Sequence, residues 1–124
     1  MTKEPLPDFE IRWARAVERD RQNNRYLSDI EADFRTVFRA QAPFESIFMG
    51  GTDRGIGATI FFEKDADIPE CEHNGTSQAM RDFIYQRLAH YGRAVAPGSV
   101  EFEFDSDENV QRNFEGNYFL RMHG

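Results

Sequence analysis

The clearest pattern of apolar and polar positions lies in residues 99–105 and predicts a β-strand. Three apolar residues alternate there with three acidic ones, in the order Val100, Glu101, Phe102, Glu103, Phe104 and Asp105. A period of two places one set of side chains in the core and the other in water. Carboxylates in a row repel one another, so the fold gains nothing from concentrating them. We interpret the row as a docking surface for a basic partner; a solvated strand face that prevents edge-to-edge aggregation is the alternative.

A period near 3.6 predicts two amphipathic helices. The first covers 28–39, where Ser28 and Glu31 have the spacing of a capping box. Its apolar stripe is Leu27, Ile30, Phe34, Val37 and Phe38. The second is capped by Thr76 or Ser77 and ends before Gly92, with the stripe Met80, Phe83, Ile84, Leu88 and Tyr91. Residues 9–22 fit either a helix or a strand, and their Ala and Arg content favours a helix.

Strands are predicted at 44–49 and 56–63, joined through GGTDRG as an antiparallel hairpin. A long acidic loop is expected at 64–75, and a short helical turn capped by Ser106 at 107–113. The last segment, NYFLRMH, predicts a closing strand. The element order is therefore α-β-β-α-β-(short α)-β.

This order predicts an α+β fold in which helices cover one face of a mostly antiparallel sheet of about four strands. The other sheet face is then partly wet and carries the acidic row. Eight residues from three amphipathic patterns are expected to share one core: Val100, Phe102, Phe104, Ile30, Phe34, Phe83, Ile84 and Leu88.

The length of 124 residues fits one domain, which we place at 9–124 after a flexible leader at 1–8 that holds two prolines. The N-terminal residues lack the apolar segment of a signal peptide, and no apolar run is long enough to span a membrane. The single cysteine, Cys71, fits a reducing compartment. We therefore expect a cytoplasmic protein without membrane contact.

The net charge of -7 is concentrated in two short stretches. One comprises Glu63, Asp65, Asp67, Glu70 and Glu72, with a single lysine among them; the other comprises Glu101, Glu103, Asp105, Asp107 and Glu108. A polyanionic partner needs a basic footprint, so nucleic-acid binding is disfavoured. Arginines cluster between Arg12 and Arg39, but acids are interleaved with them, which is typical of a solvated helix face.

Two motifs suggest ligand chemistry without meeting its requirements. The glycine-rich stretch 50–57 is followed by a strand and lacks the lysine of a phosphate loop, so a hairpin turn explains it. Cys71 and His73 form one loose Cys-x-His pair in an expected polar loop, whereas structural zinc needs two paired motifs.

Calcium and acid–base catalysis are disfavoured as well. The segment Asp105–Glu108 resembles the start of a calcium loop but has Val110 where glycine is required. Glu101 and Glu103 lie on an open strand face, whereas an acid–base pair needs a pocket. We therefore expect no catalytic residues, no metal and no cofactor, and not an enzyme.

An acidic protein that lacks such motifs suits the inhibition of a basic protein. Nucleases are basic because they bind phosphate, and opposite charge speeds their capture. The C-terminal quarter, EFEFDSDENVQRNFEGNYFLRMH, resembles bacterial immunity proteins of polymorphic toxin systems, including those of contact-dependent growth inhibition. The shared features are an acidic strand, a short helical turn led by Asp-Glu-Asn and an aromatic closing strand.

The resemblance implies a cognate toxin domain, often a nuclease, that is blocked by a one-to-one complex in the producing cell. It supplies no catalytic residues. We expect the ten carboxylates of the two acidic stretches to bind the toxin, with the arginine-rich helices as the other place for an interface. The alternative function is a regulatory module that binds a small molecule or a peptide between helix and sheet without catalysis.

Overall fold

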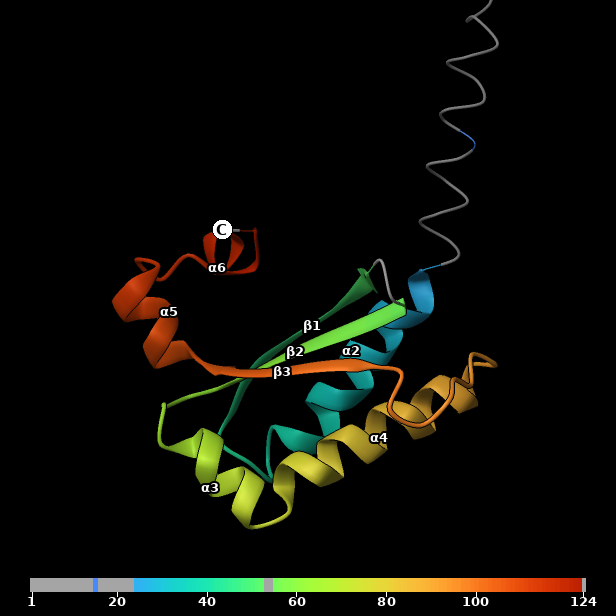
Figure 1. Cartoon of the computed structure of the whole chain (residues 1–124), viewed down its shortest axis with the longest axis horizontal. Helices are drawn as coiled ribbons and strands as arrows, with labels where there is room; N and C mark the ends of the chain where they lie inside the picture. Colours follow the sequence, from blue (N-terminus) through green and yellow to red (C-terminus); the bar gives the residue numbers. More distant parts are fainter. Residues whose placement is uncertain (1–14, 16–23, 53–54, 124) are drawn as a thin grey trace, which may run out of the picture.

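Three strands form one mixed sheet in the computed structural model, which describes residues 15, 24–52 and 55–123. In chain order the elements are α2 (Arg25–Phe38), β1 (Phe44–Thr52), β2 (Gly55–Phe62), α3 (Asp67–His73), α4 (Thr76–His90), β3 (Glu101–Ser106), α5 (Asp107–Asn113) and α6 (Tyr118–His123). Figure 1 shows α2, α3 and α4 on one side of the sheet and α6 on the other. The fold is thus α+β, as predicted.

The sheet differs from the prediction in its strand number and in one strand direction. β1 and β2 form the expected antiparallel hairpin, with Gly50 opposite Gly57, but β3 pairs with β2 in parallel. The crossover through α3 and α4 returns the chain to the starting end of β2 before β3 begins, and such a return produces a parallel pair. The prediction of about four mostly antiparallel strands was therefore wrong.

The predicted closing strand is the helix α6. Its first turn is held by Asn117, whose side-chain oxygen accepts the N–H of Leu120 at 3.0 Å. Helical spacing places Tyr118 and Met122 on one side, whereas Phe119 and Leu120 are exposed. The acidic loop expected at 64–75 also contains a helix, α3, which Cys71 anchors in the core at 2% exposure.

The helix ends depend on fewer side-chain caps than predicted. α2 begins at Arg25, so Ser28 lies within the helix and no capping box forms. Glu31 instead accepts the backbone N–H of Met49 at 2.8 Å and so covers part of the β1 edge. The N-cap of α4 is Gly75, so neither Thr76 nor Ser77 caps this helix. Its C-terminal end is as predicted, because Gly92 has φ 73° and the N–H of Arg93 reaches the carbonyl of Leu88. Ser106 caps α5 as expected, accepting the N–H of Asn109 at 3.0 Å.

The main core lies between the sheet and the layer of α2, α3 and α4. Of the eight predicted core residues, five are buried: Val100, Ile30, Phe34, Ile84 and Leu88. The other three, Phe83, Phe102 and Phe104, are partly buried and pack against this core. Phe102 and Phe104 lie on β3, which is an edge strand of the sheet that the described residues form, so only one side of it is covered by another strand. The leader at 1–8 and the segment 9–22, apart from Arg15, lie outside the described residues.

Candidate functional site

One face of the sheet is turned away from α2 and α4 and is here called the outer face. It carries glycine, aromatic and acidic residues side by side. The strand register places Phe48 and Gly50 of β1 beside Thr59 and Gly57 of β2. It also places Gly57, Thr59 and Phe61 of β2 beside Glu101, Glu103 and Asp105 of β3. Residues one step along each strand, including Ile47, Ile60 and Phe104, pack in or against the main core. The acidic row therefore lies on the outer face, as the alternation predicted.

Helix α6 packs on this face through aromatic contacts. The Tyr118 ring lies 4.9 Å from the Phe61 ring and 5.9 Å from the Phe48 ring, measured between centroids. The Arg121 guanidinium lies over the other part of the Phe61 ring, 5.8 Å from its centroid. Phe61 is fully buried as a result, although it belongs to the side of the sheet that the sequence pattern predicted to be wet.

The acidic row is partly neutralised by Arg121. Asp105 accepts hydrogen bonds from Nε of Arg121 at 2.5 Å, from Nδ2 of Asn109 at 3.1 Å and from the N–H of Ser106 at 2.8 Å. Glu103 accepts a further bond from Nη2 of Arg121. Asp105 is consequently only 9% exposed and holds α6 against the sheet. Sequence reasoning missed this role because α6 was expected to be a strand.

A second bond fixes the start of α6. The Tyr118 hydroxyl donates to Asp107 at 2.5 Å. Burial raises the pKa of Tyr118 well above its ordinary value, and the bond to Asp107 raises the pKa further. The phenol therefore stays protonated and keeps donating at every physiological pH.

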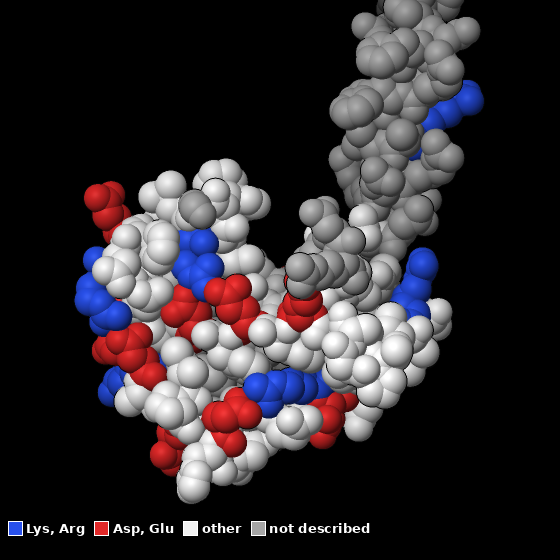
Figure 2. All heavy atoms as spheres, in the orientation of Figure 1, with Lys and Arg blue, Asp and Glu red and all other residues white. Residues whose placement is uncertain are grey.

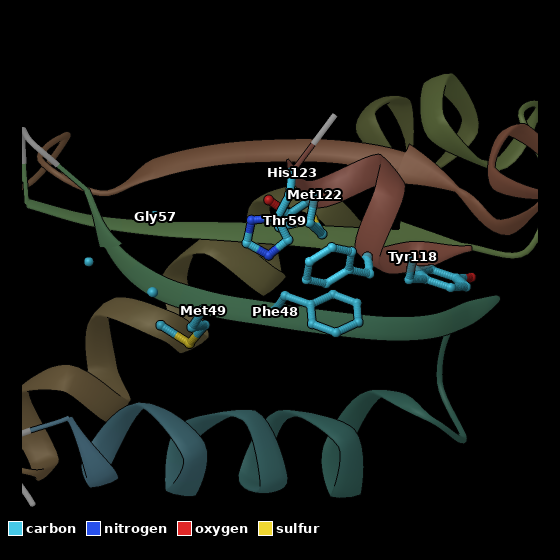
Figure 3. A pocket seen from close by; sticks show the side chains of 10 residues that line it. Phe48, Met49, Gly57, Thr59, Tyr118, Met122 and His123 are labelled. Atoms are coloured by element: carbon cyan, nitrogen blue, oxygen red, sulfur yellow. The ribbon is translucent and has the colours of Figure 1, made fainter. Parts of the chain in front are cut away.

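A groove of about 590 Å³ lies between the outer face and α6 (Figure 3). It is lined by Phe48, Met49, Gly50, Gly51, Gly57 and Thr59 from the hairpin and by Tyr118, Phe119, Met122 and His123 from α6. Two of its aromatic side chains are exposed, Phe48 at 37% and Phe119 at 69%. The lining carries no charged carboxylate, ammonium or guanidinium group, so the groove is an apolar site next to an acidic row.

The carboxyl ends of β2 and β3 bring the two acidic stretches together. Asp65 accepts the hydroxyl of Ser106 at 2.5 Å and pairs with Arg112 at 2.9 Å. Its N–H donates to Glu108 at 3.2 Å, and the Glu108 N–H reaches the carbonyl of Glu63. The bond from Ser106, with help from Arg112, lowers the pKa of Asp65, so this carboxyl stays ionised. The meeting follows from the parallel pairing, which sequence reasoning did not predict.

The ten predicted partner-binding residues fall into three groups by exposure. Six are exposed: Glu63, Glu70, Glu72, Glu101, Glu103 and Glu108. Asp65, Asp67 and Asp107 are half-buried, and Asp105 is buried. Figure 2 shows acidic atoms gathered along β3 and towards α3 and α5. Glu70 and Glu72 lie on α3, in the helix layer, and Glu72 pairs there with Arg81 at 2.8 Å. The structure thus places Glu101 and Glu103 beside the groove and Glu70 and Glu72 away from it.

The described part of the arginine-rich segment contributes no arginine to the groove. Arg25, Arg35 and Arg39 belong to or adjoin α2, on the opposite side of the sheet from the groove. Arg35 donates from Nη2 to the carbonyl of Ile47 at 3.4 Å and helps Glu31 to cover the β1 edge. Arg12 and the arginines up to residue 23, apart from Arg15, lie outside the described residues.

The glycine-rich stretch and the Cys71–His73 pair, which the sequence offered as candidate ligand sites, have structural positions. The stretch 50–57 forms the hairpin, whose tip residues 53 and 54 lie outside the described part. Cys71 was expected in an exposed loop but is buried, and burial raises the pKa of its thiol. His73 is exposed, and among the described residues no three His, Cys, Asp or Glu side chains are grouped to hold a metal ion.

Comparisons with protein-family models, curated proteins and solved structures find no match for this chain. None of the helices in the described ranges is both long enough and apolar enough to cross a membrane.

Proposed function

We propose that this chain is an immunity-type protein that binds a cognate basic toxin domain, such as a nuclease, in the cytoplasm and blocks it without catalysis of its own. The observation that carries the proposal is the outer face, where Glu101 and Glu103 lie in register beside an exposed apolar groove. An apolar centre with a polar or charged rim is the usual anatomy of a protein–protein interface.

The charge distribution supports a basic partner. The net charge is -7, and the Glu101 and Glu103 side chains lie on the same face as the groove. Carboxylates at the rim of an interface attract a basic surface over a distance comparable to the Debye length, so they act mainly on the association rate. The active surface of a nuclease is basic because it holds phosphate, and an acidic protein that covers it excludes the substrate.

The proposal makes the acids on α3 less important than the acids on β3. Glu70 and Glu72 lie on α3, in the helix layer and away from the groove. Glu63 and Glu108 are exposed at the end of the sheet, where the two acidic stretches meet. We therefore assign the partner contact to Glu101 and Glu103 first, with Glu63 and Glu108 as the outer rim.

Growth protection tests this function. The tagged chain is purified from its native host, and the proteins bound to it are identified by mass spectrometry. A basic domain found in this way, or encoded by the neighbouring gene, is then expressed alone and together with the chain. We expect the domain alone to stop growth, co-expression to restore it, and the purified pair to have a one-to-one mass by light scattering. A bound protein that is acidic, or a basic domain whose toxicity the chain does not relieve, would contradict the proposal.

A regulatory module that binds a peptide or a small apolar molecule is the second candidate, and the groove is the observation that favours it. In that case the groove alone holds the ligand, and the charges of Glu101 and Glu103 matter little. Neutralising the first of them as Glu101→Gln distinguishes the two, because it weakens the capture of a basic toxin domain and leaves a neutral apolar ligand bound.

A further inference from the structure

The floor of the groove is unusual because it is made of glycine without a conformational need for it. Gly50 and Gly57 are directly paired across β1 and β2, so they leave two adjacent positions of the outer face without side chains. Neither belongs to the glycines with positive φ, which are Gly55, Gly75, Gly92, Gly98 and Gly116. A Cβ added at Gly50 would meet no atom within 4 Å.

Glycine inside a strand weakens it, because the chain loses more freedom on folding and no side chain packs. At Gly50 the structure supplies neither a backbone conformation nor a close contact that requires glycine. A bare strand surface of this kind is typical of a place where another group approaches the backbone closely. The open position at Gly50 therefore points to a guest side chain above the floor.

The walls define the guest as apolar. Phe48 from β1 and Phe119 from α6 are exposed at 37% and 69%, and Tyr118 and Met122 of α6 complete the apolar side chains around the groove (Figure 3). Exposed aromatic side chains around a hollow lose their water contact only when an apolar group enters. The groove is thus shaped for one aromatic or long aliphatic side chain and the backbone that carries it.

The acidic residues at the rim of the groove indicate which charged groups flank the guest side chain. Gly57 is in register with Glu101, and Thr59 with Glu103, so two carboxylates follow one long side of the floor. Among the residues that the structure describes, the cation at this rim is Arg121, whose side chain is only 16% exposed and already bonds Asp105 and Glu103. Positive groups flanking the guest therefore find carboxylates, whereas a negative ligand meets repulsion.

We propose that the groove is the anchor pocket for the partner, and that it takes a phenylalanine, leucine or methionine side chain flanked by lysine or arginine on an extended segment. This inference rests on the proposed function and adds the chemistry of the contact. Interfaces concentrate their binding energy in such anchors, which insert into desolvated pockets while the charged rim sets the association rate.

A peptide titration of the isotope-labelled full chain tests the inference, with the backbone amide signals of Gly50, Gly51 and Gly57 as reporters. The probe is a short glycine–serine peptide with one phenylalanine between lysine pairs. Two matched peptides replace the phenylalanine by alanine or the lysines by glutamate. We expect the first peptide to shift the three glycine signals, and each matched peptide to bind at least about tenfold more weakly, since the buried ring or the charge match is lost.

Two variants place the binding in the groove. Gly50→Leu fills the floor and is expected to weaken the peptide at least about tenfold, since the space for the anchor is gone. Ala32→Leu adds the same side chain on the exposed side of α2 and is expected to bind the peptide like the unmodified chain. If Gly50→Leu does not fold, Phe119→Ala replaces it, because this side chain is exposed and its removal leaves the core intact. Equal binding of all three peptides, or unchanged binding by the groove variants, would overturn the inference.

The toxin domain separates this inference from the proposed function. If Gly50→Leu still neutralises the toxin fully while Glu101→Lys does not, the anchor pocket is refuted and the function stands. If the peptide binds in the groove and the chain protects against no toxin, the pocket stands and the function is refuted.

Discussion

At the scale of single residues, Arg121 explains how the fold tolerates a row of carboxylates. Its guanidinium bonds Asp105 and Glu103 and lies over the Phe61 ring. The alternation from Val100 to Asp105 was sufficient to predict that the acids share a face. It was not sufficient to predict that Asp105 is buried, because its partner lies 16 residues along the chain, on a segment expected to be a strand. Long-range pairing of this kind leaves no periodic trace in a sequence.

Removing the guanidinium is expected to destabilise the protein strongly. Arg121→Ala leaves Asp105 buried without its cation, which costs about 3 kcal/mol of the free energy of unfolding. Arg112→Ala is the matched control, because Arg112 pairs with Asp65 in a setting where both side chains are about half exposed. Its loss is expected to cost roughly 0–1 kcal/mol. Urea denaturation of the two variants measures the difference, and equal losses would show that the Arg121 pair contributes no more than a surface pair.

Tyr118 is expected to make stability depend on pH at the alkaline end. Its pKa is raised in the folded state above the ordinary value of 10.0. The folded protein therefore holds the phenol proton more tightly than the unfolded chain, so the contribution is complete below pH 10 and declines as the pH rises above it. In denaturation at increasing pH, Tyr118→Phe should lose stability less steeply than the unmodified chain. Parallel curves for the two proteins would contradict the assignment.

At the scale of elements, sequence patterns located the long segments, the acidic strand β3 and the capped helical turn α5, and they failed on α3 and α6. The helices at 25–38 and 76–90 and the hairpin follow apolar stripes that extend over several turns or strand positions. In NYFLRMH the apolar residues Tyr118, Leu120 and Met122 alternate like a strand, while Tyr118 and Met122 also have helical spacing. In so short a segment the period of the apolar residues cannot distinguish a strand from a helix. The contacts of Tyr118 and Arg121 with the sheet favour the helix. Helix α3 was missed because its segment is acidic and contains Pro69, which led to the prediction of a loop.

Helix α3 makes Cys71 a packing residue, whereas the sequence predicted that it lies in a polar loop. The thiol is 2% exposed and belongs to the main core. A serine hydroxyl in its place loses apolar contact and buries a polar group, which we expect to cost about 1–2 kcal/mol. His73→Ala, on the exposed side of the same helix, should change stability by less than about 0.5 kcal/mol. Thermal unfolding compares the two, and a neutral Cys71→Ser would contradict the packing role.

At the scale of the whole molecule, the parallel pairing of β2 and β3 determines where the two acidic stretches lie relative to each other. The composition showed two acidic stretches, but their distance in space depends on strand direction, which local patterns do not specify. The crossover through α3 and α4 brings Glu63 and Asp65 next to Glu108, and it leaves Glu101 and Glu103 along the groove. The groove itself could not be predicted, because it needs α6 folded over a glycine floor.

Association kinetics decide whether the acidic row beside the groove captures a basic toxin domain. The unmodified chain is compared with Glu101→Lys and with Glu70→Lys, which makes the same charge change on α3, away from the groove. Circular dichroism confirms that both variants are folded. We choose Glu101 because it is exposed and lies in register with Gly57 on the floor of the groove.

We expect Glu101→Lys to slow association with the purified toxin domain by about tenfold at low salt. The difference should shrink at high salt, where surface charges are screened, and Glu70→Lys should change the rate much less. Equal association rates for Glu101→Lys and the unmodified chain at low salt would contradict the claim and show that the acidic row is a solvated strand face.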